Sequence, residues 1–451
     1  MLLAAVICAA ALSTAHDSAH VTGTAGIAYY DPIAAAGATS IVVRAREGNE
    51  LEAIEMRAVA LGYATVRRAS EPPALELTPP TGVSLARAVG ALASLPGVAY
   101  AEPSYRLRLA DVPAAPLYAQ EAAYLEKEQA PAAWDIETGR TSVVVAILDT
   151  GLDVTHPDLR GRIWTNAREV EGNGVDDDGN GCIDDVHGCA FVNHAPAGCA
   201  SPVNSDVHDD LGHGTFVSGV VAASGGSGMV GVARGVTIMP VKVLDCMGGG
   251  RSFDLAQGIL YAVKNGASLL NVSLGGPVDS AYIHEAIRIA REQYGVLLVA
   301  ATGNTGGDVA YPARYPEVLA VGAESASHPG QHASFAGAGP EVDVVAIGQG
   351  IVGTVPKGIC RTFLTCLPGD DLHAVGDGTS FAAPQVTGLV ALMLSHNRYL
   401  QPDQIINIVK ATADPLPGGE PAGWAGAGRI NMLRALTPQF RLGAPGVVRG
   451  R

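Results

Sequence analysis

From residue 141 onward, apolar residues fall into short continuous runs that are separated by helical patterns. The run S-V-V-V-A-I-L at 142–148 is apolar throughout after its first residue, as expected for a strand covered on both faces. Similar runs predict strands at 236–244, 268–272, 296–300, 318–321 and 342–347. Helical patterns fall at 213–223, 252–265, 281–293 and 402–413. Strands that alternate with helices predict an α/β domain with a mostly parallel sheet and helices on both faces.

A smaller unit precedes this domain. Short β-branched or extended runs predict strands at 40–44, 63–67, 75–78 and 98–109, and helical patterns lie at 50–61 and 84–95. The resulting βαββαβ order predicts a ferredoxin-like α+β sheet with two helices on one face. Pro113 and Pro116 then mark a linker to the larger domain.

The most apolar helical segment is G-D-G-T-S-F-A-A-P-Q-V-T-G-L-V-A-L-M-L at 376–394. A helix that is apolar on nearly every side belongs in the interior of a large domain, and Pro384 is tolerated within about a turn of its start. Ser380 therefore stands among unpaired N–H groups at the N-terminus of a buried helix. Such donors stabilise the oxyanion that a serine nucleophile forms. The alternative is that Ser380 only caps the helix.

Three other polar residues stand at strand ends or at a helix start. Asp149 follows the strand at 142–148, and Asn304 follows V-L-L-V-A-A-T-G. His213 opens an apolar helix between two glycines, which let other groups approach the imidazole. Because sites form at the carboxyl ends of parallel strands, these residues are candidates for a shared site. Taken singly, Asp149 and Asn304 read as turn residues, and His213 as a structural histidine or a metal ligand.

The order Asp149, His213, Asn304, Ser380 carries a specific resemblance. D-T-G-L-D-V-T-H-P-D-L (149–159), G-H-G-T-F-V-S-G (212–219), N-V-S-L-G-G (271–276), A-A-T-G-N (300–304) and G-T-S-F-A-A-P-Q-V-T-G (378–388) are similar to the motifs of the subtilisin family of serine proteases. The resemblance implies Ser380 as nucleophile, His213 as general base and then acid, Asp149 as its orienting carboxylate and Asn304 as oxyanion donor.

The same resemblance implies how a substrate binds. Ser273, Leu274 and Gly275 resemble the strand that pairs with an extended peptide, a mode whose affinity comes from main-chain hydrogen bonds. Ala301 and Gly303, in the A-A-T-G-N motif, complete the expected substrate-binding set. The function expected is an endopeptidase acting on polypeptides. The rivals are a serine esterase, which the absence of a G-x-S-x-G elbow disfavours, and a catalytically inactive binding protein that keeps the fold.

A long acidic insertion separates Asp149 from His213. In G-N-G-V-D-D-D-G-N-G-C-I-D-D (172–185), oxygens fall at offsets 1, 3, 5 and 7 of an EF-hand-like loop, with a glycine at offset 6. The ligands expected for a structural Ca²⁺ are Asp176, Asp178, Asn180 and the Cys182 carbonyl, with closure by Asp184 or Asp185. The alternative is a solvated acidic loop. The short segment 224–231 lacks the calcium loop of some subtilisins, which argues against Asp158 as a ligand.

The net charge limits the classes of binding partner, and the N-terminal sequence and the cysteines indicate the compartment in which the protein folds. A net charge of −15 argues against nucleic acid or an anionic membrane as the main partner. The run L-L-A-A-V-I-C-A-A-A-L before Ser13-Thr14-Ala15 resembles a signal peptide, so we expect secretion. Its removal leaves six cysteines, which indicate up to three disulfides, although reduced cysteines are the alternative. Cys360 can pair with Cys366, and Cys246 with the cluster Cys182, Cys189 and Cys199.

These observations predict a secreted zymogen with five parts. They are a signal peptide at 1–15, an N-terminal extension at 16–39, an inhibitory propeptide at 40–110, a subtilisin-like catalytic domain at 111–436 and a flexible tail at 437–451. The chain's own propeptide is the expected inhibitor, with cleavage near 109–116. No organic cofactor is expected, and we expect a monomer.

Overall fold

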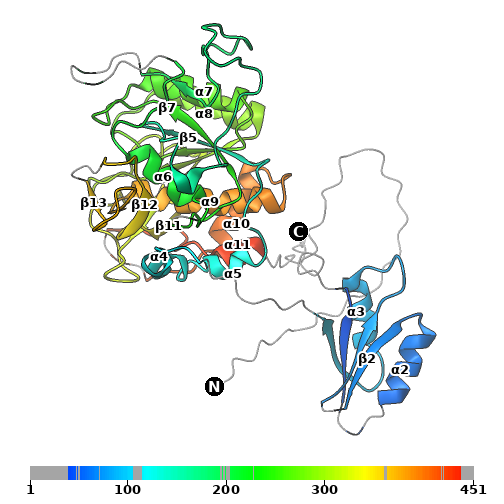
Figure 1. The fold of residues 1–451 in the computed structure, drawn as a ribbon. Helices are drawn as coiled ribbons and strands as arrows, with labels where there is room; N and C mark the ends of the chain where they lie inside the picture. The colour runs from blue at the N-terminus through cyan, green and yellow to red at the C-terminus, as the bar shows by residue number, and fades with distance from the viewer. Residues whose placement is uncertain are drawn as a thin grey trace, which may run out of the picture. The chain divides into compact units, whose positions relative to one another are not determined.

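A computed structural model of the chain describes residues 39–46, 48, 51–70, 72–104, 114–192, 196, 199, 204–226, 228–359, 363–417, 419 and 421–437. The expected signal peptide at 1–15, the extension at 16–38 and the tail at 438–451 lie outside these residues. The chain divides into two compact units between Tyr105 and Arg106. Each unit has its own hydrophobic core. Figure 1 labels helices and strands of both units.

The smaller unit has the βαββαβ order that the sequence predicts. Its antiparallel sheet has the order β2-β3-β1-β4, and strand β4 ends before the predicted end at residue 109. Residues on one face of the sheet pack on the two helices, with Ile41, Val43, Leu75 and Leu77 fully buried. The elements are β1 (Ile41–Ala45), α2 (Leu51–Ala60), β2 (Ala64–Ser70), β3 (Pro73–Thr78), α3 (Leu85–Ala93) and β4 (Val98–Pro103).

The larger unit is built on a seven-stranded sheet with the order β11-β10-β9-β8-β5-β7-β6, in which every pairing is parallel. Six of these strands match the predicted apolar runs. The seventh, β6, is only two residues long and gives no pattern in the sequence. The strands are β5 (Val144–Asp149), β6 (Cys189–Ala190), β7 (Thr237–Lys242), β8 (Leu269–Val272), β9 (Leu297–Ala301), β10 (Val318–Glu324) and β11 (Val344–Ile347).

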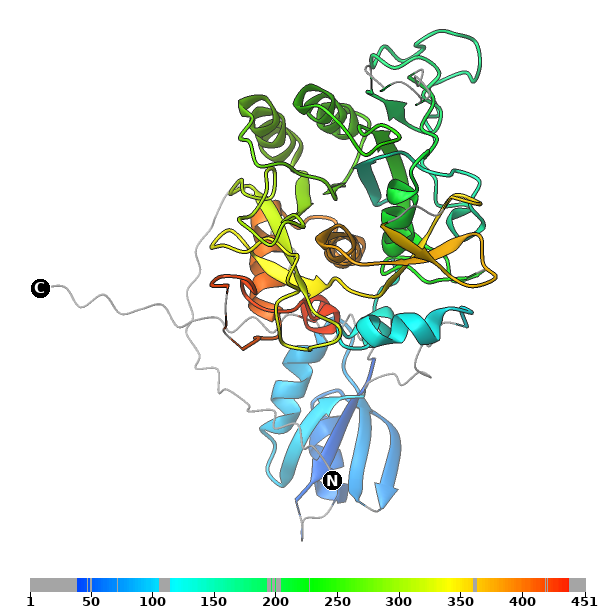
Figure 2. The same ribbon diagram turned by 90° about the vertical axis from the view of Figure 1, so that its left-hand side faces the viewer.

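Helices cover both faces of this sheet, as predicted (Figures 1 and 2). Alternate residues of β5 supply the two cores. Val145 and Ile147 pack on the side of α6 (His213–Ala222), α9 (Thr379–His396) and α10 (Pro402–Thr412), whereas Ala146 and Leu148 pack on the side of α7 (Ser252–Lys264) and α8 (Ala281–Tyr294). A strand covered on both faces has no polar alternation, which explains its continuous apolar run.

Several short elements are absent from the prediction because they are too short for a periodic pattern. They include a three-stranded antiparallel sheet with the order β12-β14-β13, whose last strand in the chain leads directly into α9. The missed elements are α4 (Tyr118–Leu125), α5 (Ala130–Trp134), a 3-10 turn (Pro157–Leu159), β12 (Ile351–Thr354), β13 (Leu364–Cys366), β14 (His373–Gly376) and α11 (Met432–Leu436).

Disulfides cross the inserted region between β5 and α6. Cys182 is bonded to Cys189, and Cys199 is bonded to Cys246, so the predicted oxidised cluster is confirmed. Cys366 is also disulfide-bonded, while Cys360, its expected partner, lies outside the described residues. The second of these bonds ties the insertion to the loop that follows β7.

Candidate active site

The carboxyl end of β5 and the start of α6 bring Asp149 and His213 together. Asp149 is the last residue of β5 and is fully buried, and its Oδ1 accepts hydrogen bonds from His213 Nδ1 at 2.7 Å and from the Thr150 N–H at 2.7 Å. Gly214 allows this approach, because a Cβ at that position would lie 2.2 Å from the Gly151 carbonyl oxygen and 3.2 Å from Asp149 Cβ. The glycine beside His213 thus lets the helix start close on the strand end.

The groups around His213 raise its pKa. Burial acts to lower the pKa of His213, while the charge and hydrogen bond of Asp149 and the charge of Asp209 raise it. The net result is a pKa above its ordinary value of 6.5. His213 is therefore a stronger base than a free imidazole, and its neutral form is reached only at a pH above that of an ordinary histidine.

Ser380 is the second residue of α9, as predicted for a serine at the start of a buried helix. Its Oγ donates to the Ser273 carbonyl at 3.0 Å, and the Ser273 Oγ donates to the Ser380 carbonyl at 2.9 Å. The second bond has a cause in the sequence, since Pro384 lacks the N–H that would otherwise bond the carbonyl four residues earlier. Pro384 lies in the second turn of α9, slightly later than expected.

Ser380 and His213 face the same cleft without a hydrogen bond between them in the described structure. The cleft is lined by His213, Ser380 and Asn304, and by Ser273, Leu274 and Gly275. The ring of Phe381 packs between His213 and Phe216, with centroids at 5.5 Å and 4.1 Å. Residues that sequence reasoning missed also form its walls: Thr150, Leu211, Leu244, Cys246, Met247, Gly248, Phe363 and Asp377.

Hydrogen bonds to its amide oxygen orient the Asn304 side chain and leave its amide nitrogen able to donate to another group. Its Oδ1 accepts from the Thr379 N–H at 2.9 Å and from Thr379 Oγ1 at 2.8 Å. The Gly303 N–H donates to the same Thr379 hydroxyl at 3.1 Å, and Ala301 is buried at the end of β9. Ala301 and Gly303 thus lie behind Asn304, and among the described residues they support the cleft wall without lining the cleft.

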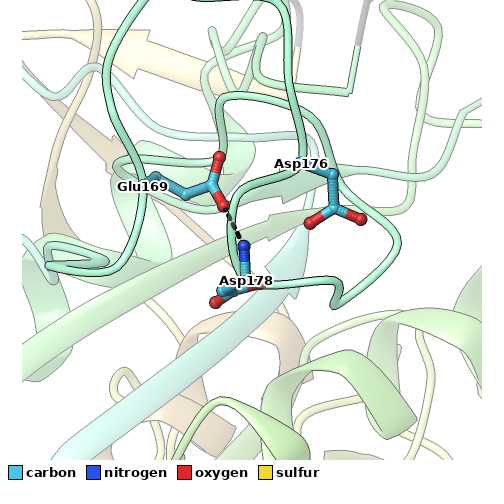
Figure 3. Close-up of side chains that lie close together, drawn as sticks. All are labelled: Glu169, Asp176 and Asp178. Atoms are coloured by element: carbon cyan, nitrogen blue, oxygen red, sulfur yellow. Dashed lines mark hydrogen bonds between the residues drawn. The ribbon is translucent and has the colours of Figure 1, made fainter.

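The acidic insertion gathers carboxylates. Asp176 Oδ1 accepts from the N–H groups of Gly179 and Asn180, and its Oδ2 from that of Gly181, so the loop turns tightly around this side chain. One oxygen each of Glu169, Asp176 and Asp178 lie within 4.8 Å of one another, and Figure 3 shows the three side chains. Glu169 Oε1 accepts from the Asp178 N–H at 3.1 Å, while its buried Oε2 has no partner among the described residues.

The other predicted ligands are engaged differently. Asn180 Oδ1 accepts from the Cys182 N–H, and Asp184 accepts from the N–H groups of Asn173 and Gly174. Asp185 is fully buried and accepts from Asn166, Asn180 and Tyr261. Glu169 was missed because it lies outside the loop spacing that suggested the site.

Asp158, disfavoured as a calcium ligand from the sequence, has protein partners. Its Oδ2 lies 2.7 Å from His373 Nε2 and accepts from the Met229 N–H, and its Oδ1 accepts from the Gly228 N–H. His373 Nδ1 in turn lies 2.8 Å from Asp370 Oδ2. Asp158 and His373 are buried and Asp370 is partly exposed, and this Asp–His–Asp chain ties the 3-10 turn at Pro157–Leu159 to β14.

Comparisons with known proteins agree with this geometry. A family model described as "Subtilase family" matches residues 140–428. The chain is 33% identical over 352 residues to the thermophilic serine proteinase of Bacillus sp. (strain AK1), covering 77% of this chain and 75% of that protein. It is 32% identical over 359 residues to subtilisin E of Bacillus subtilis (strain 168), covering 77% and 78%. It is 36% identical over 278 residues to the intracellular serine protease of Paenibacillus polymyxa, covering 60% and 71%.

Proposed function

Because the chain belongs to the subtilase family and is a serine endopeptidase, we propose that Asp149, His213 and Ser380 are its catalytic triad. The observation that carries the assignment is the bond of 2.7 Å between Asp149 Oδ1 and His213 Nδ1, on a histidine that shares its cleft with Ser380. In this role His213 removes the proton of Ser380 as Oγ attacks a peptide carbonyl, and later donates it to the leaving amine.

The nucleophile requires a small rearrangement before it reacts. Ser380 Oγ must leave the Ser273 carbonyl and turn toward His213 Nε2, which is free because Asp149 holds Nδ1. A rotation about χ1 between staggered wells accomplishes this and is fast for a partly exposed side chain. The Ser273 carbonyl then loses this donor, and an extended substrate can supply an N–H in its place.

The oxyanion has two donors within reach of the nucleophile. The Ser380 N–H belongs to the first turn of α9, where no intrahelical acceptor exists. Asn304 Nδ2 is left free to donate because Thr379 holds the amide oxygen. Fixed donors of this kind stabilise the negative charge on the tetrahedral intermediate. The segment Ser273–Leu274–Gly275, which directly follows β8, would pair with the peptide main chain, so that many sequences bind.

The remaining parts of the chain fit a secreted zymogen. The segment 1–15 would direct export, the unit up to residue 110 would act as inhibitor, and cleavage near 109–116 would release the catalytic unit as a monomer. Disulfides support export, because they persist in oxidising compartments. The relative with an intracellular title means that the family alone does not decide the compartment. Among the described helices, none is long and apolar enough to cross a membrane.

Active-site labelling tests the assignment. A fluorophosphonate should form one adduct, on Ser380, in protein whose new N-terminus lies within 109–116, and this protein should cleave casein. Labelling followed by peptide mass spectrometry measures both. A processed protein without an adduct would instead favour an inactive binding protein, and turnover of short-chain esters without casein cleavage would favour an esterase.

The acidic insertion fits a calcium ion. Oxygens bound to one Ca²⁺ at about 2.4 Å can lie at most about 5 Å apart, which Glu169, Asp176 and Asp178 satisfy at 4.8 Å. The buried Glu169 Oε2, which lacks a hydrogen-bond donor among the described residues, also suits a cation. Arg168, which now pairs with Asp178 at 2.9 Å, is largely exposed and could swing aside. The ion would fix the insertion without entering the chemistry.

Removing calcium should therefore lower stability. With calcium at about a hundred times its Kd, the bound ion contributes about 3 kcal/mol, so EGTA should lower the thermal midpoint by about 4 °C. The measurement uses phosphonylated enzyme, which cannot digest itself. Asp178→Asn should remove most of the calcium dependence, whereas Asp177→Asn should keep it, since Asp177 bonds only Val170 and Asn173 in the described structure. An unchanged midpoint in EGTA would leave a solvated acidic loop.

A further inference from the structure

We propose that Asp209 is a positioning residue for the reaction, acting through Thr150 on the Asp149–His213 pair. The inference rests on the triad assigned above and adds a second buried carboxylate beneath it. Asp209 does not line the cleft in the described structure, so it touches no substrate. Its effect reaches the reacting atoms through one hydroxyl, one backbone N–H and its own charge.

The Asp209 carboxylate is fully buried and saturated with donors at the start of α6. Its Oδ1 accepts from the N–H groups of Leu211 and Gly212, and its Oδ2 accepts from the N–H and the Oγ1 of Thr215. Negative charge is favourable at the N-terminus of a helix, where N–H groups lack intrahelical acceptors. Asp209 therefore fixes the loop that carries His213.

Thr150 joins this carboxylate to the catalytic pair. Its Oγ1 donates to Asp209 Oδ1 at 2.7 Å and accepts from the Gly214 N–H at 2.9 Å. Its own N–H donates to Asp149 Oδ1 at 2.7 Å, the oxygen that also holds His213 Nδ1. A shift of Thr150 would thus move Asp149, to which it is bonded through its N–H, and Gly214, the residue after His213, together. The Thr150 hydroxyl therefore fixes the position of the end of β5 relative to the start of α6.

Charges on three sides of Thr150 complete the arrangement. Lys242, which is nearly fully buried on β7, donates to the Thr150 carbonyl and lies 3.5 Å from Asp210 Oδ2. The charged groups around Thr150 and His213 in the described structure are Asp149, Asp209, Lys242 and the partly exposed Asp210, and Asp377 lines the cleft that His213 faces. Of these, Asp149 and Asp209 raise the pKa of His213. When His213 takes the proton of Ser380, both carboxylates, which are themselves fully buried, stabilise the imidazolium.

Asp209→Asn tests the proposal in the mature enzyme with a chromogenic peptide. Removing the charge should lower kcat by about tenfold or more, with KM changed little, because the charge of Asp209 stabilises protonated His213, which forms in the transition state and not when the substrate binds. It should also move the acid limb of the kcat profile to lower pH, since the imidazolium loses one stabilising charge. The matched control Asp206→Asn should keep kcat and the acid limb of the wild type, since the Asp206 carboxylate accepts only from the His208 N–H in the described structure.

Thr150 variants separate positioning from folding. Thr150→Val should lower kcat, and Thr150→Ser, which keeps the hydroxyl, should restore it. If Asp209→Asn does not process itself, a cleavage site for an added protease within 109–116 releases the mature variant, and the pH dependence of its fluorophosphonate labelling at Ser380 gives the same acid limb. Wild-type kcat and acid limb in Asp209→Asn overturn the proposal, as does a loss of kcat without any movement of the limb. A Ser380→Ala enzyme that stays active would instead overturn the triad itself.

Discussion

Replacing Ser380 by alanine should abolish peptide hydrolysis, with kcat lowered by about a millionfold, a magnitude carried over from subtilisin. Alanine leaves the helix and the cleft in place but removes the only nucleophile assigned to the site. The precursor should also remain uncleaved when expressed alone, because we propose that the catalytic unit itself makes the cleavage near 109–116. The measurements are steady-state hydrolysis of a peptide substrate and mass spectrometry of the precursor.

A second serine provides the matched control. Ser280 caps α8 and accepts from the Ile283 N–H, so it has the purely structural role that was the alternative for Ser380. Ser280→Ala should cost about 1 kcal/mol of stability and leave kcat unchanged. Normal processing of the Ser380→Ala precursor would exclude self-cleavage. Hydrolysis at the wild-type rate would remove Ser380 from the mechanism.

Replacing Asp149 by asparagine should lower kcat by about 10⁴-fold without changing the fold of the site. The asparagine amide can meet His213 Nδ1 with its N–H₂ group, which favours the tautomer whose Nε2 carries the proton. His213 then cannot accept the proton of Ser380, and the imidazolium loses its nearest counter-charge. The measurement is kcat with a peptide substrate, together with the unfolding midpoint of phosphonylated or inhibitor-bound enzyme.

Asp153→Asn is the control for this second variant. Asp153 follows in the same D-T-G-L-D segment, but among the described residues its carboxylate bonds only the N–H and hydroxyl of Thr155. We expect activity within about twofold of the wild type, since surface substitutions of this kind have small effects. An Asp149→Asn enzyme that keeps a tenth or more of the wild-type kcat would mean that Asp149 does not orient the base.

The main elements of the fold could be predicted because burial on both faces leaves a direct signature. The run at 142–148 is apolar after its first residue, and the helical segment at 376–394 is apolar on nearly every side past Ser380. Strand β5 and helix α9 lie at these places. The three-stranded sheet that leads into α9 leaves no such signature, since its strands are three or four residues long. Its position depends on contacts such as His373 with Asp158, which join residues far apart in the chain.

Less of the candidate site than of the fold could be predicted from the sequence. The motifs identified Asp149 and His213, and the structure holds them in contact. The bond from Ser380 to the Ser273 carbonyl could not be foreseen, because it depends on a side-chain rotation that no residue pattern encodes. Glu169 was missed for another reason, since the EF-hand spacing describes a single loop and Glu169 joins it from outside.

The strand order of the large sheet has a consequence for the lifetime of the enzyme. Central strand β5 pairs with β8, so that Val145 lies beside Leu269, and Val345 bridges to Arg429 near the end of the unit. Pairings between such distant residues form slowly and make the barrier to folding high. When the free energy of the native state also lies well below the top of that barrier, spontaneous unfolding is rare. A protease shares its solution with other copies of itself, and rare opening is what protects each copy from digestion by its neighbours.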